Sequence, residues 1–223
     1  MVTADQTAAD RIPPRGTSPD LDRAQAAPPQ AALLQPEPPQ PAQPQPAQPQ
    51  RRQVASLRLR PLRLDDEAAF LAAHRQMAED GFNFGLFLGP DMAWTEYLRL
   101  LRDHQAGVNL SQRLVPSTFL VADVAGQIVG RVSIRHRLNE FLVRYGGHIG
   151  FGVLRSHRRR GYATEILRQS LIIARAIGID RVLVTCDDDN VGSMTVIEAC
   201  GGQLEDVTEA DPGAPAIRRY WID

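Results

Sequence analysis

The sequence contains no lysine, and all 25 of its basic residues are arginine. A Walker-type nucleotide site places a lysine on the phosphates, and a pyridoxal-phosphate enzyme forms its Schiff base on a lysine. The absence of lysine therefore excludes both classes. Acidic residues number 26, so the formal net charge is −1 at pH 7. This balance gives no electrostatic support for nucleic-acid binding.

Cysteine is scarce, since the chain has only Cys186 and Cys200. Their separation does not fit a CxxC pair, and two cysteines do not make a disulfide framework. We interpret both as reduced thiols in a cytoplasmic protein, and we assign no metal ligands. The sequence also lacks an apolar run of signal-peptide or membrane-spanning length. We therefore expect no membrane association.

Proline is unevenly distributed, because 12 of the 17 prolines lie within the first 50 residues. The segment Gln35–Gln50 consists almost wholly of Pro, Gln and Ala. Such a composition lacks the apolar residues that offset the entropy of ordering a chain. It predicts a disordered tail over residues 1–52 with polyproline II character. The folded domain should then cover residues 53–223. A solvated tail and a partner-binding arm both fit this composition, and the solvated tail is the simpler interpretation.

Hydrophobic periodicity predicts alternating strands and helices in the domain. Strands are expected at residues 54–59, 118–123, 127–136, 148–154, 181–186, 204–208 and 217–222. Helices are expected after a cap at Asp65 and Asp66, over residues 92–104 and 163–177, and after a cap at Asn190. The glycine-rich, aromatic segment 81–90 reads as a loop. The order of elements implies an α/β fold in which helices cover a mixed sheet.

One segment carries most of the functional signal, namely HIGFGVLRSHRRRGYATEIL at residues 148–167. An apolar strand runs into three arginines, then into Gly161 and an amphipathic helix. The first turn of a helix has free N–H groups and a positive dipole end, which together bind anions. Gly161 lets a ligand approach the backbone closely. The segment therefore suits a pyrophosphate, although an ordinary strand–helix turn with solvated arginines is an open alternative. It is no dinucleotide fingerprint, because Arg155 occupies the third glycine position.

The pattern Arg158-x-x-Gly161-x-Ala163 resembles the signature of the GNAT superfamily of N-acetyltransferases. The segments RHRLNEFL, GGHIGF, TCDDDN and SMTVIEACGG are similar to those of one bacterial subgroup of this superfamily. The resemblance covers about residues 57–222. It implies a GNAT-type fold, with a central mixed, mostly antiparallel sheet flanked by helices.

The resemblance also implies the reaction, in which an amine of a small molecule or protein directly attacks acetyl-CoA within a ternary complex. Acetyl-CoA is then the acyl-donor co-substrate. Its pyrophosphate would lie on the backbone of the turn, and its pantetheine arm along the preceding strand. Asn190 would contact that arm, although it is equally explained as a helix cap. The implied cofactor-binding residues are Phe151, Val153, Arg158, Arg159, Arg160, Gly161, Tyr162, Ala163, Thr164, Asn190 and Ser193.

Proton transfer needs a separate assignment, because an amine attacks only when it is neutral. His148 is the first candidate for the base, since its ordinary pKa suits neutral pH. A structural role for this histidine is the alternative, and Glu140 and Asp187 are weaker candidates. Many members of the family carry a tyrosine acid seven residues after the asparagine, where this chain has Ile197. That departure leaves the identity of the acid open.

The acceptor is not identified by the sequence. Asp80, Phe82, Phe84 and Phe87 lie where the family often builds its acceptor pocket, although core packing explains the aromatic residues equally well. Glu205–Asp211 forms an acidic segment near the other expected edge. A non-catalytic acyl-CoA-binding module or sensor is the alternative function, motivated by Ile197. A second copy of the chain, in a homodimer, is a further candidate partner.

Overall fold

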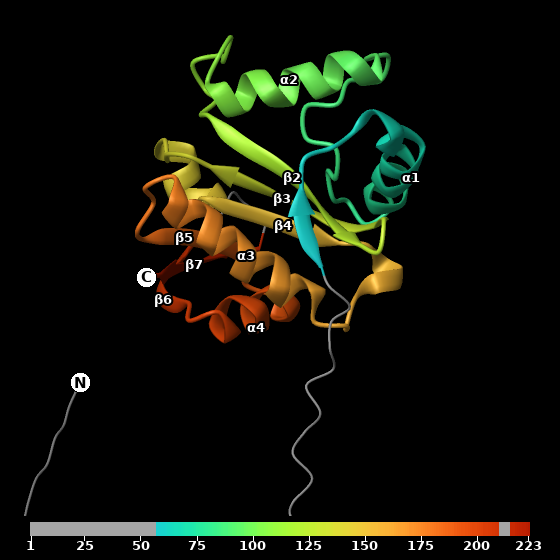
Figure 1. Ribbon diagram of the computed structural model, residues 1–223. Coiled ribbons are helices and arrows are strands. Elements are labelled where there is room, and N and C mark those ends of the chain that lie inside the picture. Colours follow the sequence, from blue (N-terminus) through green and yellow to red (C-terminus); the bar gives the residue numbers. More distant parts are fainter. Residues whose placement is uncertain (1–56, 210–214) are drawn as a thin grey trace, which may run out of the picture. The chain divides into compact units, whose positions relative to one another are not determined.

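The structure is a computed structural model that describes residues 57–209 and 215–223 (Figure 1). The predicted tail over residues 1–52, the start of the first strand and Asp211 lie outside the described residues. The elements follow in the order β1 (Arg58–Arg60), α1 (Glu67–Ala78), α2 (Trp94–Ala106), β2 (Ser117–Val124), β3 (Gln127–Arg135), β4 (Ile149–Val153), α3 (Tyr162–Ala176), β5 (Val182–Asp187), α4 (Val191–Ala199), β6 (Gln203–Thr208) and β7 (Ile217–Ile222).

The strands form two antiparallel sheets, with the orders β1-β2-β3-β4 and β5-β7-β6. They meet where β4 and β5 begin, because the His148 N–H donates to the Leu183 carbonyl at 2.7 Å. Beyond this point the described residues show no backbone hydrogen bond between β4 and β5. The facing edge of β4 is therefore open along the rest of its length. The prediction of a mixed α/β fold with a mostly antiparallel sheet is confirmed.

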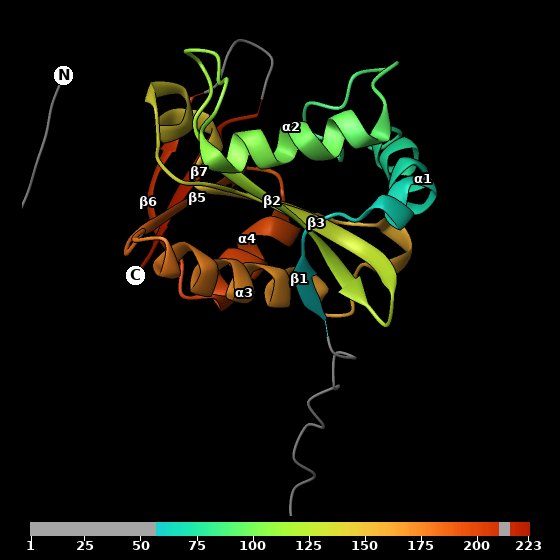
Figure 2. The same cartoon turned by 45° about the horizontal axis from the view of Figure 1, so that its top comes forward.

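Helices cover both faces of the sheet, with α3 on one face and α2 on the other (Figure 2). One core cluster joins α3 to strands of both sheets, and a second joins α1 and α2 to β2. The amphipathic pattern of α3 is confirmed, because Ile166, Leu167 and Leu171 are buried. Gly178 follows the helix with a φ of 87°, which is the left-handed conformation expected of a C-terminal cap.

The start of α1 differs from the prediction that Asp66 caps this helix. Its side chain makes no capping hydrogen bond. The carboxylate accepts instead from the Arg60 guanidinium at 2.6 Å and from the Arg63 N–H at 2.7 Å. Arg60 also pairs with the buried Asp123 of β2. Arg60 and Arg63, six and three residues before Asp66, thus take its carboxylate in place of the cap. The pair of Arg60 with Asp123, across 63 residues, fixes β1 against β2.

Two turns position the strands that carry the site. Ala125 and Gly126 form the tight turn between β2 and β3, with φ values of 51° and 84°. The segment between β3 and β4 contains a π-helical turn, Leu142–Gly146, which the sequence analysis did not predict. Thr185 of β5 donates to the Tyr145 carbonyl at 2.8 Å, so this turn also contacts the second sheet.

Candidate active site

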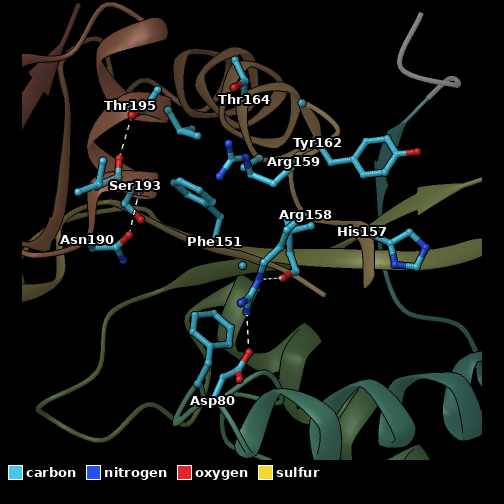
Figure 3. Close-up of a pocket in the computed structure, with 18 of the residues that line it drawn as sticks. Asp80, Phe151, His157, Arg158, Arg159, Tyr162, Thr164, Asn190, Ser193 and Thr195 are labelled. Atoms are coloured by element: carbon cyan, nitrogen blue, oxygen red, sulfur yellow. Dashed lines mark hydrogen bonds and ion pairs between the residues drawn. The ribbon is translucent and has the colours of Figure 1, made fainter. Parts of the chain in front are cut away.

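A cavity of about 1030 Å³ lies between the open edge of β4, the first turns of α3 and α4, and the segment that follows α1 (Figure 3). Its lining residues are Met77, Asp80, Phe82, Phe151, Gly152, Val153, His157, Arg158, Arg159, Gly161, Tyr162, Ala163, Thr164, Asn190, Val191, Gly192, Ser193, Thr195 and Val196. Of the eleven expected cofactor residues, ten are in this set. Arg160 is exposed and is not among them.

The turn before α3 has the geometry of an anion site. Arg159 and Gly161 have φ values of 63° and 82°, which place both in the left-handed region. Within the described part of the chain, no backbone N–H from Arg159 to Thr164 donates a backbone hydrogen bond. No side chain caps the 15-residue helix either. The free N–H groups and the positive end of the helix dipole therefore face the cavity together.

The arginines around this turn do not all face the cavity freely. Arg158 donates from Nε to the Val153 carbonyl at 3.1 Å and from Nη2 to Asp80 at 2.8 Å. Arg155 pairs with the other carboxylate oxygen of Asp80. The hydrogen bond from Arg155, with that from Arg158, lowers the pKa of the Asp80 carboxyl. Asp80 therefore ties the segment after α1 to the turn before α3.

The first turn of α4 supplies the opposite wall of the cavity. The Asn190 side chain accepts from the Ser193 N–H at 3.0 Å, which confirms that Asn190 caps the helix. The Thr195 hydroxyl donates to the Val191 carbonyl at 2.9 Å. The Ser193 hydroxyl makes no hydrogen bond to another described residue, so it is available to a ligand.

The environment of His148 favours the structural interpretation of this residue. The ring is buried, and its Nδ1 accepts from the Leu183 N–H at 2.9 Å. Burial, together with the charge of Arg135, lowers the pKa of the imidazole. In the neutral ring the proton then sits on Nε2, so neither nitrogen has a free lone pair. His148 does not line the cavity, and Glu140 and Asp187 are exposed residues outside it.

Ile197 occupies the position of the family's usual tyrosine. Its side chain is fully buried in the core cluster that surrounds α3, and it does not line the cavity. The residue at the tyrosine position therefore packs into the core on this face of α4 and does not reach the cavity.

The four residues expected near the acceptor separate into two groups. Asp80 and Phe82 line the cavity. Phe84 is fully buried, with its ring 5.3 Å from that of Phe70, and Phe87 packs on His104 at 4.4 Å. Core packing therefore accounts for Phe84, whereas Phe87 is 38% exposed and its ring covers the buried His104.

Sequence reasoning missed several lining residues, including Met77, His157 and Thr195. His157 lies inside the arginine-rich turn, so the motif itself could have identified it. Met77 comes from α1 and has no local signal. In residues 57–209 and 215–223, no cluster of His, Cys, Asp or Glu could hold a metal ion. No helix in these ranges is long and apolar enough to cross a bilayer.

Comparison with known proteins places this geometry in a family. RimJ of Mycobacterium smegmatis, in complex with CoA-disulfide, is 22% identical over 74% of this chain and 81% of its own, with a TM-score of 0.54. A Salmonella typhimurium acetyl transferase that modifies the N-terminal serine of ribosomal protein L7/L12 is 17% identical, with coverages of 75% and 95% and a TM-score of 0.54. No curated protein matches the chain. The model of the acetyltransferase (GNAT) domain matches residues 56–203, and the chain belongs to this family of acetyltransferases.

Proposed function

We propose that this chain transfers an acetyl group from acetyl-CoA to an amine that attacks the thioester directly. One observation carries the proposal, namely that Arg159 and residues 161–164 line the cavity and have N–H groups without a backbone partner among the described residues. Backbone N–H groups at a helix N-terminus bind phosphate without any particular side chain. The pyrophosphate of acetyl-CoA has this chemistry.

The open edge of β4 supports the placement of the rest of the cofactor. Phe151 and Val153 line the cavity, and the edge that faces β5 has no strand partner. An unpaired strand edge offers N–H and carbonyl groups to an extended amide chain. The pantetheine arm contains two amides, so it would lie along this edge. A backbone N–H of β4 would then polarise the thioester carbonyl.

Two titratable side chains of the described lining could accept a proton, namely His157 and Asp80. Burial and the charge of Arg160 lower the pKa of His157, and two arginines hold the pKa of Asp80 low. The neutral His157 ring, directly or through water, would therefore take the proton from the ammonium, and the attacking amine would be its neutral fraction. The Ser193 hydroxyl is placed to donate to the pantetheine arm or to the departing thiolate. A sensor that binds acyl-CoA without turnover would release no thiol with any amine.

Ala163→Leu tests the cofactor placement. Ala163 lies in the first turn of α3 and lines the cavity, so the larger side chain would fill the space beside the N–H groups. Leucine is a strong helix former, so the fold should persist. We expect the affinity for CoA to fall by about 100-fold, since well-placed hydrogen bonds to a charged group are each worth about 1.5–3 kcal/mol. Calorimetry with CoA measures the change.

Ala176→Leu is the matched control, because Ala176 lies at the exposed end of the same helix. This variant should bind CoA like the wild type. Circular dichroism and the thermal midpoint should be the same for both variants. If Ala163→Leu binds CoA normally while it remains folded, the proposed placement of the pyrophosphate is wrong.

A further inference from the structure

Strand β3 carries two arginines, one buried and one half-buried, on the sheet face opposite α3. Arg131 is 4% exposed, and Arg135 is half-buried. Both alternate with core residues of β3, so their side chains project from the same face. Among the described residues, neither guanidinium has a carboxylate within 4 Å, whereas the buried Arg60 has two.

Arg131 is held by backbone carbonyls and an aromatic ring. Its two terminal nitrogens donate to the Gly150 carbonyl at 2.9 Å and to the Asn83 carbonyl at 2.8 Å. Its guanidinium carbon lies 4.4 Å from the centre of the Phe82 ring. The Nε–H is buried and has no partner among the described residues. The charge of Arg131 is therefore balanced only by dipoles and a π face.

Arg135 lies directly beside the backbone of β4. Its Nη1 donates to the Gly146 carbonyl at 2.9 Å. A Cβ on Gly150 would lie 3.2 Å from this nitrogen, so the glycine makes room for the guanidinium. Nε and Nη2 of Arg135 make no hydrogen bond to described residues. The planar group thus retains donors for a ligand.

A buried cation without a counter-charge is unfavourable in the empty protein. Burial lowers the pKa of both arginines, and the charge of Arg135 adds to the effect at Arg131. A guanidinium nevertheless stays protonated at neutral pH. Two such cations on one strand therefore create a positive field at this face that an anionic ligand would neutralise.

The position of the pair relates it to the acceptor rather than to the cofactor phosphates. Phe82 lines the cavity and also packs on Arg131. Arg131 faces Gly152 across the β3–β4 ladder, and Gly152 lines the cavity as well. Arg135 lies beside Gly150, two residues and roughly 7 Å further along β4. Neither arginine lines the cavity itself, so Arg131 lies directly behind its Phe82 and Gly152 wall, and Arg135 lies further along the same face of β3.

We propose that Arg135, supported by the charge of Arg131, binds a carboxylate of the acceptor amine. The acceptor is then a small amino acid or a related amine that carries a carboxylate. This inference rests on the proposed acetyl transfer. A planar carboxylate accepts two parallel hydrogen bonds from a guanidinium, which fits the free donors of Arg135.

The experiment is calorimetry on the full chain saturated with CoA, with product-like probes. N-acetyl-4-aminobutyrate carries the carboxylate, and N-propylacetamide is its neutral counterpart. We expect the wild type to bind the carboxylate probe at least about tenfold more tightly, the range of one charge-assisted hydrogen bond. Arg135→Gln, which keeps a donor but removes the charge, should abolish this preference. N-acetyl-2-aminoethylphosphonate shows whether a tetrahedral anion binds instead.

Arg137→Gln is the matched control, because Arg137 is exposed and only two residues away. It should retain the preference for the carboxylate. Equal binding of both probes by the wild type, binding of neither, or an unchanged preference in Arg135→Gln would overturn the inference. Tighter binding of the phosphonate than of the carboxylate would do so too. A separate titration of the wild type with CoA alone comes first, and absence of CoA binding there identifies a failure of the proposed function instead.

A further variant tests whether another part of the chain supplies a negative charge to Arg131 and Arg135. Asp211 lies outside the described residues, between β6 and β7 in sequence. If Asp211→Asn creates carboxylate binding that the wild type lacks, Asp211 itself is the partner of the arginines, and the inference is overturned. An unchanged preference in this variant supports the assignment of the pair to the acceptor.

Discussion

The two sides of β4 are built in different ways. On the side of α3, the cavity is lined by Arg159 and residues 161–164, whose backbone N–H groups are free of backbone partners among the described residues. On the side of α1, it presents side chains such as Phe82 and Asp80, with Arg131 behind them. A backbone site depends on the shape of one turn, whereas a side-chain site depends on the identity of each residue. The first arrangement suits a cofactor with fixed chemistry, and the second suits a particular acceptor.

Gly152 separates these two sides, and its substitution should have the largest effect. A Cβ at this position would lie 2.5 Å from Cζ of Phe82. Gly152→Ala should therefore displace the phenylalanine and destabilise the protein by about 1–3 kcal/mol, the usual cost of overpacking. Turnover should fall more than CoA affinity, because the displaced ring lies on the acceptor side. Urea denaturation and steady-state kinetics measure the two changes.

A double variant tests whether the Phe82 ring is the cause. Gly152→Ala combined with Phe82→Ala should recover part of the stability, since the clash is gone. Gly150→Ala is a milder comparison, because its Cβ would meet the movable end of Arg135 at 3.2 Å. If the double variant is less stable than Gly152→Ala by the full cost of Phe82→Ala alone, the two positions are independent.

The α3 side of the site could be predicted from the sequence because its residues are contiguous. Arg158, Gly161 and Ala163 lie within six positions, and their spacing alone indicated the turn and its free N–H groups. The helix cap at Asn190 was equally local. By contrast, Arg131 meets Asn83 across 48 residues, and Arg158 meets Asp80 across 78. Such pairs depend on strand register and helix packing, which short-range patterns do not specify.

The role of His148 also depends on a contact between residues far apart in the sequence. Its position before the cofactor strand was visible in the sequence, and a neutral-pH base was a reasonable hypothesis. The hydrogen bond to the Leu183 N–H depends on how the two sheets meet, 35 residues apart. Where a histidine's lone pair is directed cannot be inferred from its neighbours in the chain.

His148 joins the two sheets, so its substitution should mainly affect stability. His148→Ala leaves the buried Leu183 N–H without an acceptor, which should cost about 1–3 kcal/mol. His148→Asn should cost less, because its Oδ1 can replace Nδ1 as the acceptor. We expect turnover at saturating substrate to change little in either variant once they are folded. A selective loss of turnover, with the thermal midpoint unchanged, would restore His148 as the base.

The pH dependence of stability gives a second test of this role. The folded-state pKa of His148 lies below the unfolded value of about 6.5. The unfolded chain therefore binds more protons in acid, and stability should fall as the pH drops below about 6.5. This slope should be shallower in His148→Asn. It should not vanish, because burial also lowers the pKa values of His104, His136 and His157.

The smallest expected effect concerns Asp80, which lies on the α1 side of β4 and pairs with two arginines before α3. Its partners Arg155 and Arg158 are largely exposed, so the ion pairs contribute little to stability. Asp80→Asn should leave the thermal midpoint nearly unchanged. It also removes a negative charge from the cavity in which we propose that the pyrophosphate binds, and it releases Arg158. We therefore expect CoA to bind about two- to fivefold more tightly at low salt, with the gain lost at high salt through screening. Weaker CoA binding in this variant would show instead that Asp80 holds the turn in its binding conformation, and that the two sides of β4 are coupled through this carboxylate.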